Sequence, residues 1–212
     1  MQLKEENRIK KNNSLQTIMA LAIETAKTGA EKGEVPIGAV LVCDGEILAR
    51  AHNQKESLAD PTAHAEMLVI RAGAQKLGRW RLDDCQLYVT AEPCVMCMGA
   101  IIQARIPLLV YGVAEKKFGG VESTARLDQH PMLSKQMVIY AGICEQECEA
   151  LLKDFFEKRR NKDEEQIKGL FYNLANHWSQ QYFKKAGKTG YGRRDARDRF
   201  RKQICSDQNP SR

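Results

Sequence analysis

The residues best suited to chemistry are one histidine and two cysteines, which stand in two short motifs. His64 begins the motif H-A-E with Ala65 and Glu66, whereas Cys94 and Cys97 stand in P-C-V-M-C. Two cysteines that lie three positions apart on a helix face the same way and can hold one ion together. With an imidazole they give Zn²⁺ three protein ligands, and a tetrahedral ion then keeps a fourth position for water. The pattern therefore predicts an open, catalytic zinc site.

A carboxylate is placed where this chemistry needs a proton carrier. Glu66 follows His64 by two residues, in what we expect to be the first turn of a helix. There its carboxylate can sit beside the metal-bound water without binding the metal, and can move protons to and from a reacting group. A closed zinc site that only braces the fold would need a fourth protein ligand, and the position of Glu66 argues against that alternative.

Two helix starts must bring the motifs together. One helix is predicted over residues 63–77 with Thr62 as its N-cap, and a second over 94–105 after Pro93. Both motifs thus fall at N-terminal helix ends, where the helix dipole favours the anionic thiolate that binds zinc. A redox role for the C-x-x-C pair would need thioredoxin-like surroundings, which the H-A-E motif does not suit.

The remaining elements follow an α/β pattern. Apolar residues at steps of three and four predict an amphipathic helix over 15–27, and Asp44-Gly45 predicts the turn of a hairpin. Strands that alternate with helices after an opening hairpin indicate an α/β domain built on a mixed sheet. The predicted strands are 37–42, 46–50, 85–90, 108–112 and 136–141, and the last helix of this domain is 144–160.

Beyond the two motifs, the sequence closely resembles the bacterial tRNA-specific adenosine deaminases from about Asn13 to about Arg160. The stretches that resemble the family are E-V-P-I-G-A-V-L-V (34–42), D-P-T-A-H-A-E (60–66), L-Y-V-T-A-E-P-C-V-M-C-M-G-A (87–100) and D-F-F-E-K-R-R (154–160). The resemblance implies a three-layer α/β/α fold similar to that of cytidine deaminases, with a mixed central sheet. It also implies a homodimer whose active sites are completed across subunits.

The resemblance further implies a reaction, the hydrolytic deamination of adenosine to inosine at the wobble position, 34, of tRNA. His64, Cys94 and Cys97 would hold one Zn²⁺ per subunit, and no organic cofactor is expected. Glu66 would take the proton from the zinc-bound water and deliver it to the purine ring nitrogen and then to the leaving amine. Because an anticodon loop is single-stranded, the wobble adenosine can enter a pocket without the opening of a duplex. The expected partner is the tRNA anticodon stem-loop, and neither DNA nor a membrane is expected.

Other residues match family positions that contact the substrate. Asn53 would hydrogen-bond the target purine, and the backbone of Ala65 would face the base. An acidic residue near the substrate ribose corresponds to Glu115, although the family usually has aspartate followed by K-x-G-A, and this chain has K-K-F-G-G after Glu115. The last helix of the domain would contact the RNA loop through Phe155, Phe156, Arg159 and Arg160.

Two other functions are compatible with the same motifs. A deaminase of a free base or nucleoside, such as guanine or cytosine, shares the zinc signature. A catalytically silent tRNA-binding subunit is the other alternative, raised by Glu115 and by the extended C-terminal segment. Asn53, the D-F-F-E-K-R-R helix and the basic C-terminal segment favour a polymeric substrate, whereas Glu66 speaks against a silent subunit.

The charge of the chain is concentrated at its C-terminal end. The 212 residues include 33 Lys plus Arg and 27 Asp plus Glu, but residues 184–212 alone hold ten Lys or Arg and three Asp. Residues 169–212 also hold 7 of the 14 aromatic side chains, more than simple disorder favours. We expect an added helix that packs on the deaminase body or its dimer partner, then a basic arm at 188–202 that contacts RNA phosphates. The apolar stripe of the added helix consists of Ile167, Leu170, Phe171, Leu174, Trp178 and Tyr182.

These patterns predict three segments and a cytoplasmic protein. The segments are a polar N-terminal extension (1–12), a zinc deaminase domain (13–168) and an aromatic helix with a basic tail (169–212). No apolar run approaches the roughly 20 residues that span a bilayer, and the polar start does not suggest a secretory signal. The seven cysteines are therefore interpreted as thiols or metal ligands, with Cys43 and Cys85 among the buried thiols.

Overall fold

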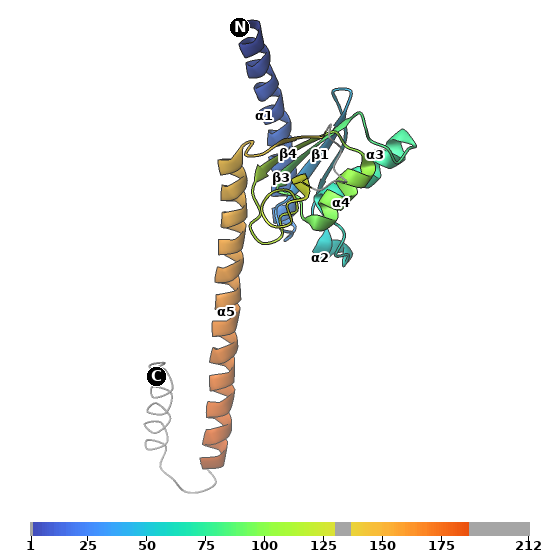
Figure 1. Cartoon of the computed structure of the whole chain (residues 1–212). Coiled ribbons are helices and arrows are strands. Elements are labelled where there is room, and N and C mark those ends of the chain that lie inside the picture. The colour runs from blue at the N-terminus through green and yellow to red at the C-terminus, as the bar shows by residue number, and fades with distance from the viewer. Residues whose placement is uncertain (1, 130–136, 187–212) are drawn as a thin grey trace. The chain divides into compact units, whose positions relative to one another are not determined.

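The computed structural model describes residues 2–129 and 137–186. Within these residues one five-stranded sheet forms, with the strand order β2-β1-β3-β4-β5. Helices cover both of its faces, and α3 and α4 lie together on one of them (Figure 1). The strands are β1 (Gly38–Cys43), β2 (Glu46–His52), β3 (Cys85–Ala91), β4 (Leu108–Val113) and β5 (Val138–Tyr140).

The strand pairings confirm the mixed sheet. β1 pairs antiparallel with both β2 and β3, whereas β4 is parallel to β3 and to β5. The predicted hairpin joins β1 to β2 through Asp44 and Gly45, whose φ angles are 50° and 80°. Positive φ at both turn residues suits the right-handed twist of the strands and explains the Asp-Gly pair.

The helices are α1 (Gln2–Glu31), α2 (Lys55–Leu58), α3 (Ala65–Leu77), α4 (Val95–Ala104) and α5 (Glu145–Ala186), with a 3-10 turn at Leu127–Gln129. The prediction that Thr62 is the N-cap of α3 is wrong, because the helix begins two residues later with His64 as its N-cap. Oδ1 of Asp60 accepts hydrogen bonds from the backbone N–H and the hydroxyl of Thr62, both at 2.7 Å. Thr62 therefore belongs to the preceding turn.

Side chains of β1 alternate between two cores, which makes the sheet the middle layer of three. Val40 and Val42 face the core that α1 covers, and Leu41 faces the core beneath α3 and α4. A strand buried on both faces needs apolar residues at every position, as the run in β1 shows. The first core includes Leu15, Met19, Ala22, Ile23, Tyr88, Val110 and Cys148, and the second includes Val69, Leu87, Val89, Met98, Ile101 and Leu109.

The predicted apolar stripe of the first helix is confirmed, and one glycine explains how closely that helix packs. Met19, Ala22 and Ala26 are fully buried. A Cβ atom on Gly38 would lie 2.1 Å from the backbone oxygen of Ala22. Only glycine therefore lets the start of β1 approach α1 to this distance.

The chain divides into two units, residues 1–157 and 158–212, and α5 passes from the first into the second. The helical segments that were expected to end at residue 160 and to resume near 167 are therefore one helix. In the second unit, Ile167, Leu170 and Tyr172 are exposed. The predicted basic arm at 188–202 lies outside the described residues, and the three-segment division stays a prediction. Among the described helices, none has the length and apolar character to cross a membrane.

Candidate metal centre and active site

The predicted site residues follow three strands at one edge of the sheet. Asn53 comes directly after β2, Cys94 comes shortly after β3, and Glu115 comes shortly after β4. β2, β3 and β4 run in the same direction, because β2 and β3 are both antiparallel to β1 and β4 is parallel to β3. Their carboxyl ends therefore meet at one edge, where α/β sheets bind their ligands.

Two helix starts bring His64, Cys94 and Cys97 together. His64 is the N-cap of α3 and Cys94 is the N-cap of α4, but neither side chain caps its own helix. Nδ1 of His64 lies 3.7 Å from Sγ of Cys94 and 3.5 Å from Sγ of Cys97. A tetrahedral zinc ion with bonds of about 2.0 Å to nitrogen and 2.3 Å to sulfur would hold such atoms roughly 3.5 Å apart. The three side chains therefore fit a zinc-sized ion.

The surroundings of Cys94 and Cys97 shift the pKa values of their thiols. A hydrogen bond from Cys97 and the nearby imidazole of His64 outweigh burial and lower the pKa of Cys94 to about 4. The same contact with Cys94, together with burial, raises the pKa of Cys97. The lowered pKa of Cys94 favours its thiolate form, and a helix N-terminus stabilises that charge.

Glu66 lies beside this group and has an unused oxygen. Its side chain is only 3% exposed, in the first turn of α3. Among the described residues, Oε2 of Glu66 is the only buried side-chain nitrogen or oxygen without a hydrogen-bond partner. Burial raises the pKa of Glu66, which also interacts with His64 and Cys97. A buried polar atom without a partner is costly, so its presence points to a ligand at this position.

Asn53 joins the end of β2 to the start of α3. It is 3% exposed, and its Oδ1 accepts a hydrogen bond from the backbone N–H of Ala65 at 2.9 Å. Its carbonyl oxygen lies 2.6 Å from Nδ1 of His52, whose Nε2 is 3.3 Å from the Lys32 ammonium. Because an ammonium only donates, Nε2 of His52 accepts, and Nδ1–H donates to Asn53. His52 is thus hydrogen-bonded at both ring nitrogens and supports Asn53.

Glu92 is a site residue that the sequence motifs did not reveal. It is 4% exposed, and its Oε1 accepts three consecutive backbone N–H groups, those of Val121, Glu122 and Ser123, at 2.9–3.0 Å. Its Oε2 accepts the backbone N–H of Glu115 at 2.9 Å and the hydroxyl of Ser123. Burial opposes ionisation, but these hydrogen bonds outweigh it and hold the pKa of Glu92 below its usual value. A charged residue directly after a strand that has no other charge is the signal that could have revealed it.

Residues 115–123 form the loop that Glu92 holds. This loop contacts the start of α4. The backbone N–H of Gly120 donates to the carbonyl oxygen of Pro93 at 2.7 Å, and Gly119 forms a β-bridge with Cys94. A Cβ atom on Gly120 would lie 2.7 Å from the backbone of Cys94, and one on Gly119 would lie 2.4 Å from the oxygen of Glu115. The two glycines after Phe118 therefore permit contact with the start of α4, which carries Cys94 and Cys97.

The other predicted contact residues lie in two places. Glu115 is half-buried on the loop, and its Oε1 accepts the backbone N–H of Lys117 at 2.9 Å. Phe155 and Phe156 pack edge to face on α5, with ring centroids 5.5 Å apart, and Phe156 is 42% exposed. Contacts between these residues and an RNA stay a prediction. Arg159 and Arg160 are exposed on the part of α5 in the second unit.

Comparisons with known proteins place residues 13–160 in the family of MafB19-like deaminases. The tRNA-specific adenosine deaminase of Bacillus subtilis (strain 168) is 45% identical over 152 residues, which are 72% of this chain and 94% of that protein. A solved structure from a study of A-to-I editing by tRNA:A34 deaminases at the wobble position is 46% identical, with a TM-score of 0.62 over 64% of this chain and 99% of that one. A guanine deaminase structure from Nitrosomonas europaea shares the fold at 21% identity and a TM-score of 0.57, over 66% of this chain and 83% of that one.

Proposed function

This chain belongs to the tRNA-specific adenosine deaminase family, and from that premise we propose that it converts adenosine to inosine at position 34 of tRNA. The reaction consumes one water and releases ammonia. The observation that supports it best is the grouping of His64, Cys94 and Cys97 beside the buried, unpartnered Oε2 of Glu66. Three ligands and one free carboxylate are the parts that a metal-assisted hydrolysis of a C–N bond requires.

We propose that His64, Cys94 and Cys97 hold Zn²⁺. One imidazole and two thiols suit zinc better than magnesium or calcium, which prefer oxygen ligands. Zinc bound by three protein ligands lowers the pKa of a fourth-position water to about 7 and so supplies a nucleophile at neutral pH. Glu66 stays outside the group of ligand atoms, which leaves its carboxylate for proton transfer.

Glu66 performs the proton transfers. Its Oε2 accepts one proton from the attacking water and passes it to N1 of the purine. It then accepts the second proton from the oxygen newly bound to C6 and passes it to the amine as the C6–N bond breaks. Burial raises the pKa of Glu66, which brings its proton affinity closer to neutral pH than that of an exposed glutamate. The carboxyl can therefore both take and return a proton within one turnover.

Asn53 and Ala65 orient the base. Oδ1 of Asn53 is used by the backbone N–H of Ala65, so the amide Nδ2 is the group that can donate to a purine nitrogen. The hydrogen bond from His52 to the Asn53 carbonyl fixes the residue from the other side. A rigid amide of this kind selects the orientation of the base without a conformational search.

Residues of the 115–123 loop and of α5 contact the anticodon stem-loop of the RNA. One oxygen of Glu115 accepts the backbone N–H of Lys117, which leaves its other oxygen for a ribose hydroxyl. Phe118 is 70% exposed beside the metal-binding helix and offers a ring on which an unstacked base can rest. Phe155, Phe156, Arg159 and Arg160 extend the RNA contacts along α5.

We also propose that the chain acts as a homodimer in the cytoplasm. Val95 is 52% exposed directly after the ligand Cys94, and together with Phe118 it gives the surroundings of the centre an apolar surface for a second copy. Six cysteines lie in the described part of the chain and all are free thiols, as a reducing compartment favours.

The decisive experiment incubates the zinc-loaded protein with an anticodon stem-loop that carries adenosine at the wobble position, followed by nucleoside analysis. We expect inosine at that position, and none from a loop with adenosine at a neighbouring position. The variant Glu66→Gln should bind the RNA and retain its zinc, but should lose at least about 10²-fold in turnover. Deamination of free guanine, cytosine or adenosine without conversion of the stem-loop would overturn the proposal.

A further inference from the structure

A second pair of cysteines lies on the two central strands, at the strand ends opposite the candidate metal centre. Cys43 is the last residue of β1 and Cys85 is the first residue of β3, and the two are paired in the antiparallel register. Paired residues of neighbouring strands point to the same face of a sheet. The run from Cys85 to Ala91 separates this pair from the active-site edge by about 20 Å, at roughly 3.3 Å per residue.

A carboxylate completes a group of three metal-binding side chains. Oδ1 of Asp84 lies 3.5 Å from Sγ of Cys85. The ligand atoms of Cys43, Asp84 and Cys85 all lie within 4.8 Å of one another, as do those of His64, Cys94 and Cys97. Two sulfurs on one tetrahedral zinc ion are roughly 3.8 Å apart, so an ion requires at most about 1 Å of closure.

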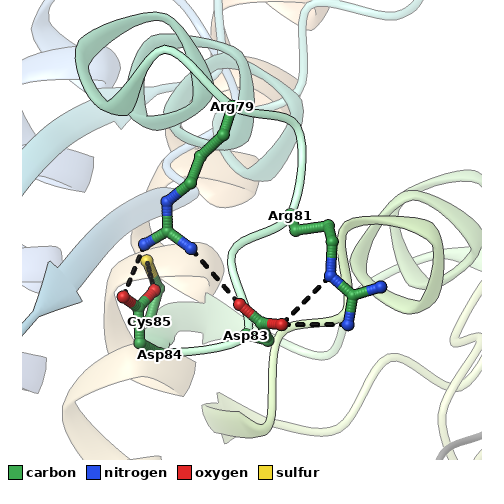
Figure 2. Close-up of polar contacts among 5 residues, drawn as sticks. All are labelled: Arg79, Arg81, Asp83, Asp84 and Cys85. Carbon is green, nitrogen blue, oxygen red and sulfur yellow. Dashed lines mark hydrogen bonds and ion pairs between the residues drawn. The ribbon is translucent and has the colours of Figure 1, made fainter.

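Arg79 orients the Asp84 carboxylate toward the thiols. Nη2 of Arg79 lies 2.5 Å from Oδ2 of Asp84, which leaves Oδ1 facing Cys85. Arg79 also donates to Asp83 at 3.3 Å, and Arg81 donates to the other oxygen of Asp83 at 2.9 Å (Figure 2). Hydrogen bonds from surrounding residues orient ligating carboxylates in the same way in established metal sites.

From this arrangement we propose that Cys43, Asp84 and Cys85 form a second metal site, which binds a thiophilic divalent cation such as Zn²⁺ or Cd²⁺. Two sulfurs and one oxygen favour such ions over Mg²⁺ and Ca²⁺. The site opens to solvent through Asp84, whose side chain is 42% exposed, while Cys43 and Cys85 are 6% and 0% exposed. A water from the exposed side can fill the fourth position.

The bound ion would connect the end of β1 to the start of β3. These strands form the middle of the sheet: β3 leads to Cys94 at the other end, where the start of β1 pairs with the end of β2 beside Asn53. This site is independent of the proposed deaminase activity, since it shares no residue with that centre.

Cadmium titration of the full-length chain tests the proposal. The thiols are kept reduced, bound metal is counted by elemental analysis, and the sulfur-to-cadmium absorption band is followed. We expect two equivalents per chain in the wild type and one in the double variant Cys43→Ser/Cys85→Ser. In Cys94→Ser/Cys97→Ser, one equivalent with thiolate absorption should remain. A single equivalent in the wild type, or a second one that survives Cys43→Ser/Cys85→Ser, would overturn the proposal.

A matched pair of surface variants covers the case in which the buried double variant does not fold. Asp84→Asn removes the negative charge of the ligand carboxylate and should weaken the second equivalent at least about tenfold. Asp83→Asn changes the neighbouring acid, which also contacts Arg79, whereas the oxygen directed at the Cys85 thiol belongs to Asp84. It should leave the second affinity unchanged. Equal affinity in Asp84→Asn and the wild type would contradict the assignment.

Discussion

Oδ1 of Asn53 accepts the backbone N–H of Ala65, and this single hydrogen bond of 2.9 Å connects the amide proposed to bind the base to the start of α3, where His64 and Glu66 lie. A change at Asn53 therefore alters two things at once, the donor offered to the purine and the position of α3. Variants that separate the two effects are informative.

Asn53→Asp keeps the oxygen that accepts the Ala65 N–H and removes the Nδ2 donor. We expect this variant to fold, with kcat/KM for the stem-loop about 10-fold to 100-fold lower, since removal of a hydrogen bond costs about 1–3 kcal/mol. Asn53→Ala should show a similar decrease and also unfold more easily, by about 1–3 kcal/mol. Steady-state kinetics and urea denaturation distinguish the two variants. Wild-type kcat/KM in Asn53→Asp would remove Asn53 from substrate binding.

Glu92→Gln should loosen the loop at 115–123. The new NH₂ group cannot accept the backbone N–H groups that the carboxylate now holds, and charge-assisted hydrogen bonds contribute about 1.5–3 kcal/mol each. We expect unfolding free energy to fall by about 2–3 kcal/mol and the loop to become sensitive to proteases.

Glu115→Gln is the control for that change, because it keeps the oxygen that accepts the Lys117 N–H. Its stability should change by less than about 0.5 kcal/mol. Equal protease resistance in Glu92→Gln and Glu115→Gln would show that Glu92 does not hold the loop.

Glu34 should make the free energy of unfolding depend on pH in the acid range. It is 1% exposed, its Oε1 accepts the backbone N–H and hydroxyl of Ser57, and its Oε2 accepts the N–H of Glu56. Burial disfavours its charge, but these hydrogen bonds hold the pKa of Glu34 below 4.5. The stabilisation is complete above pH 4.5 and is lost as the pH falls through the lower pKa of the folded state.

Glu34→Gln should therefore lower the unfolding free energy at pH 7 by about 2 kcal/mol and flatten its dependence on pH below 4.5. Denaturant unfolding of the variant and the wild type at pH 7, 5, 4 and 3 measures both effects. An identical slope in the variant and the wild type would exclude Glu34 as the group responsible.

The basic arm at 188–202 should contribute to RNA affinity by neutralising phosphates. Deletion of residues 188–212 should reduce the slope of log K against log salt by about 0.7 for each phosphate that the arm neutralises. Binding of the stem-loop at several salt concentrations measures the slope. An unchanged slope would show that the arm binds no phosphate.

The grouping of His64, Cys94 and Cys97 could be predicted from the sequence because each lies at the start of a helix whose pattern is local. Glu92 could not, because its partners lie 23–31 residues later in the chain, and only the folded loop shows why a charge is buried there. The helix α2 was missed for a similar reason. It buries no residue of its own, and the N–H groups of Glu56 and Ser57 at its start are bound by Glu34, more than 20 residues earlier.

The loop held by Glu92 limits where substrate preference can be redesigned. Gly119 and Gly120 have no room for a side chain, and Glu92 fixes the backbone at both ends of the loop. The intervening positions Lys116, Lys117 and Phe118 are exposed. Libraries that aim at new RNA sequences or at DNA should therefore vary these three consecutive side chains first, because their replacement leaves the metal-binding scaffold intact.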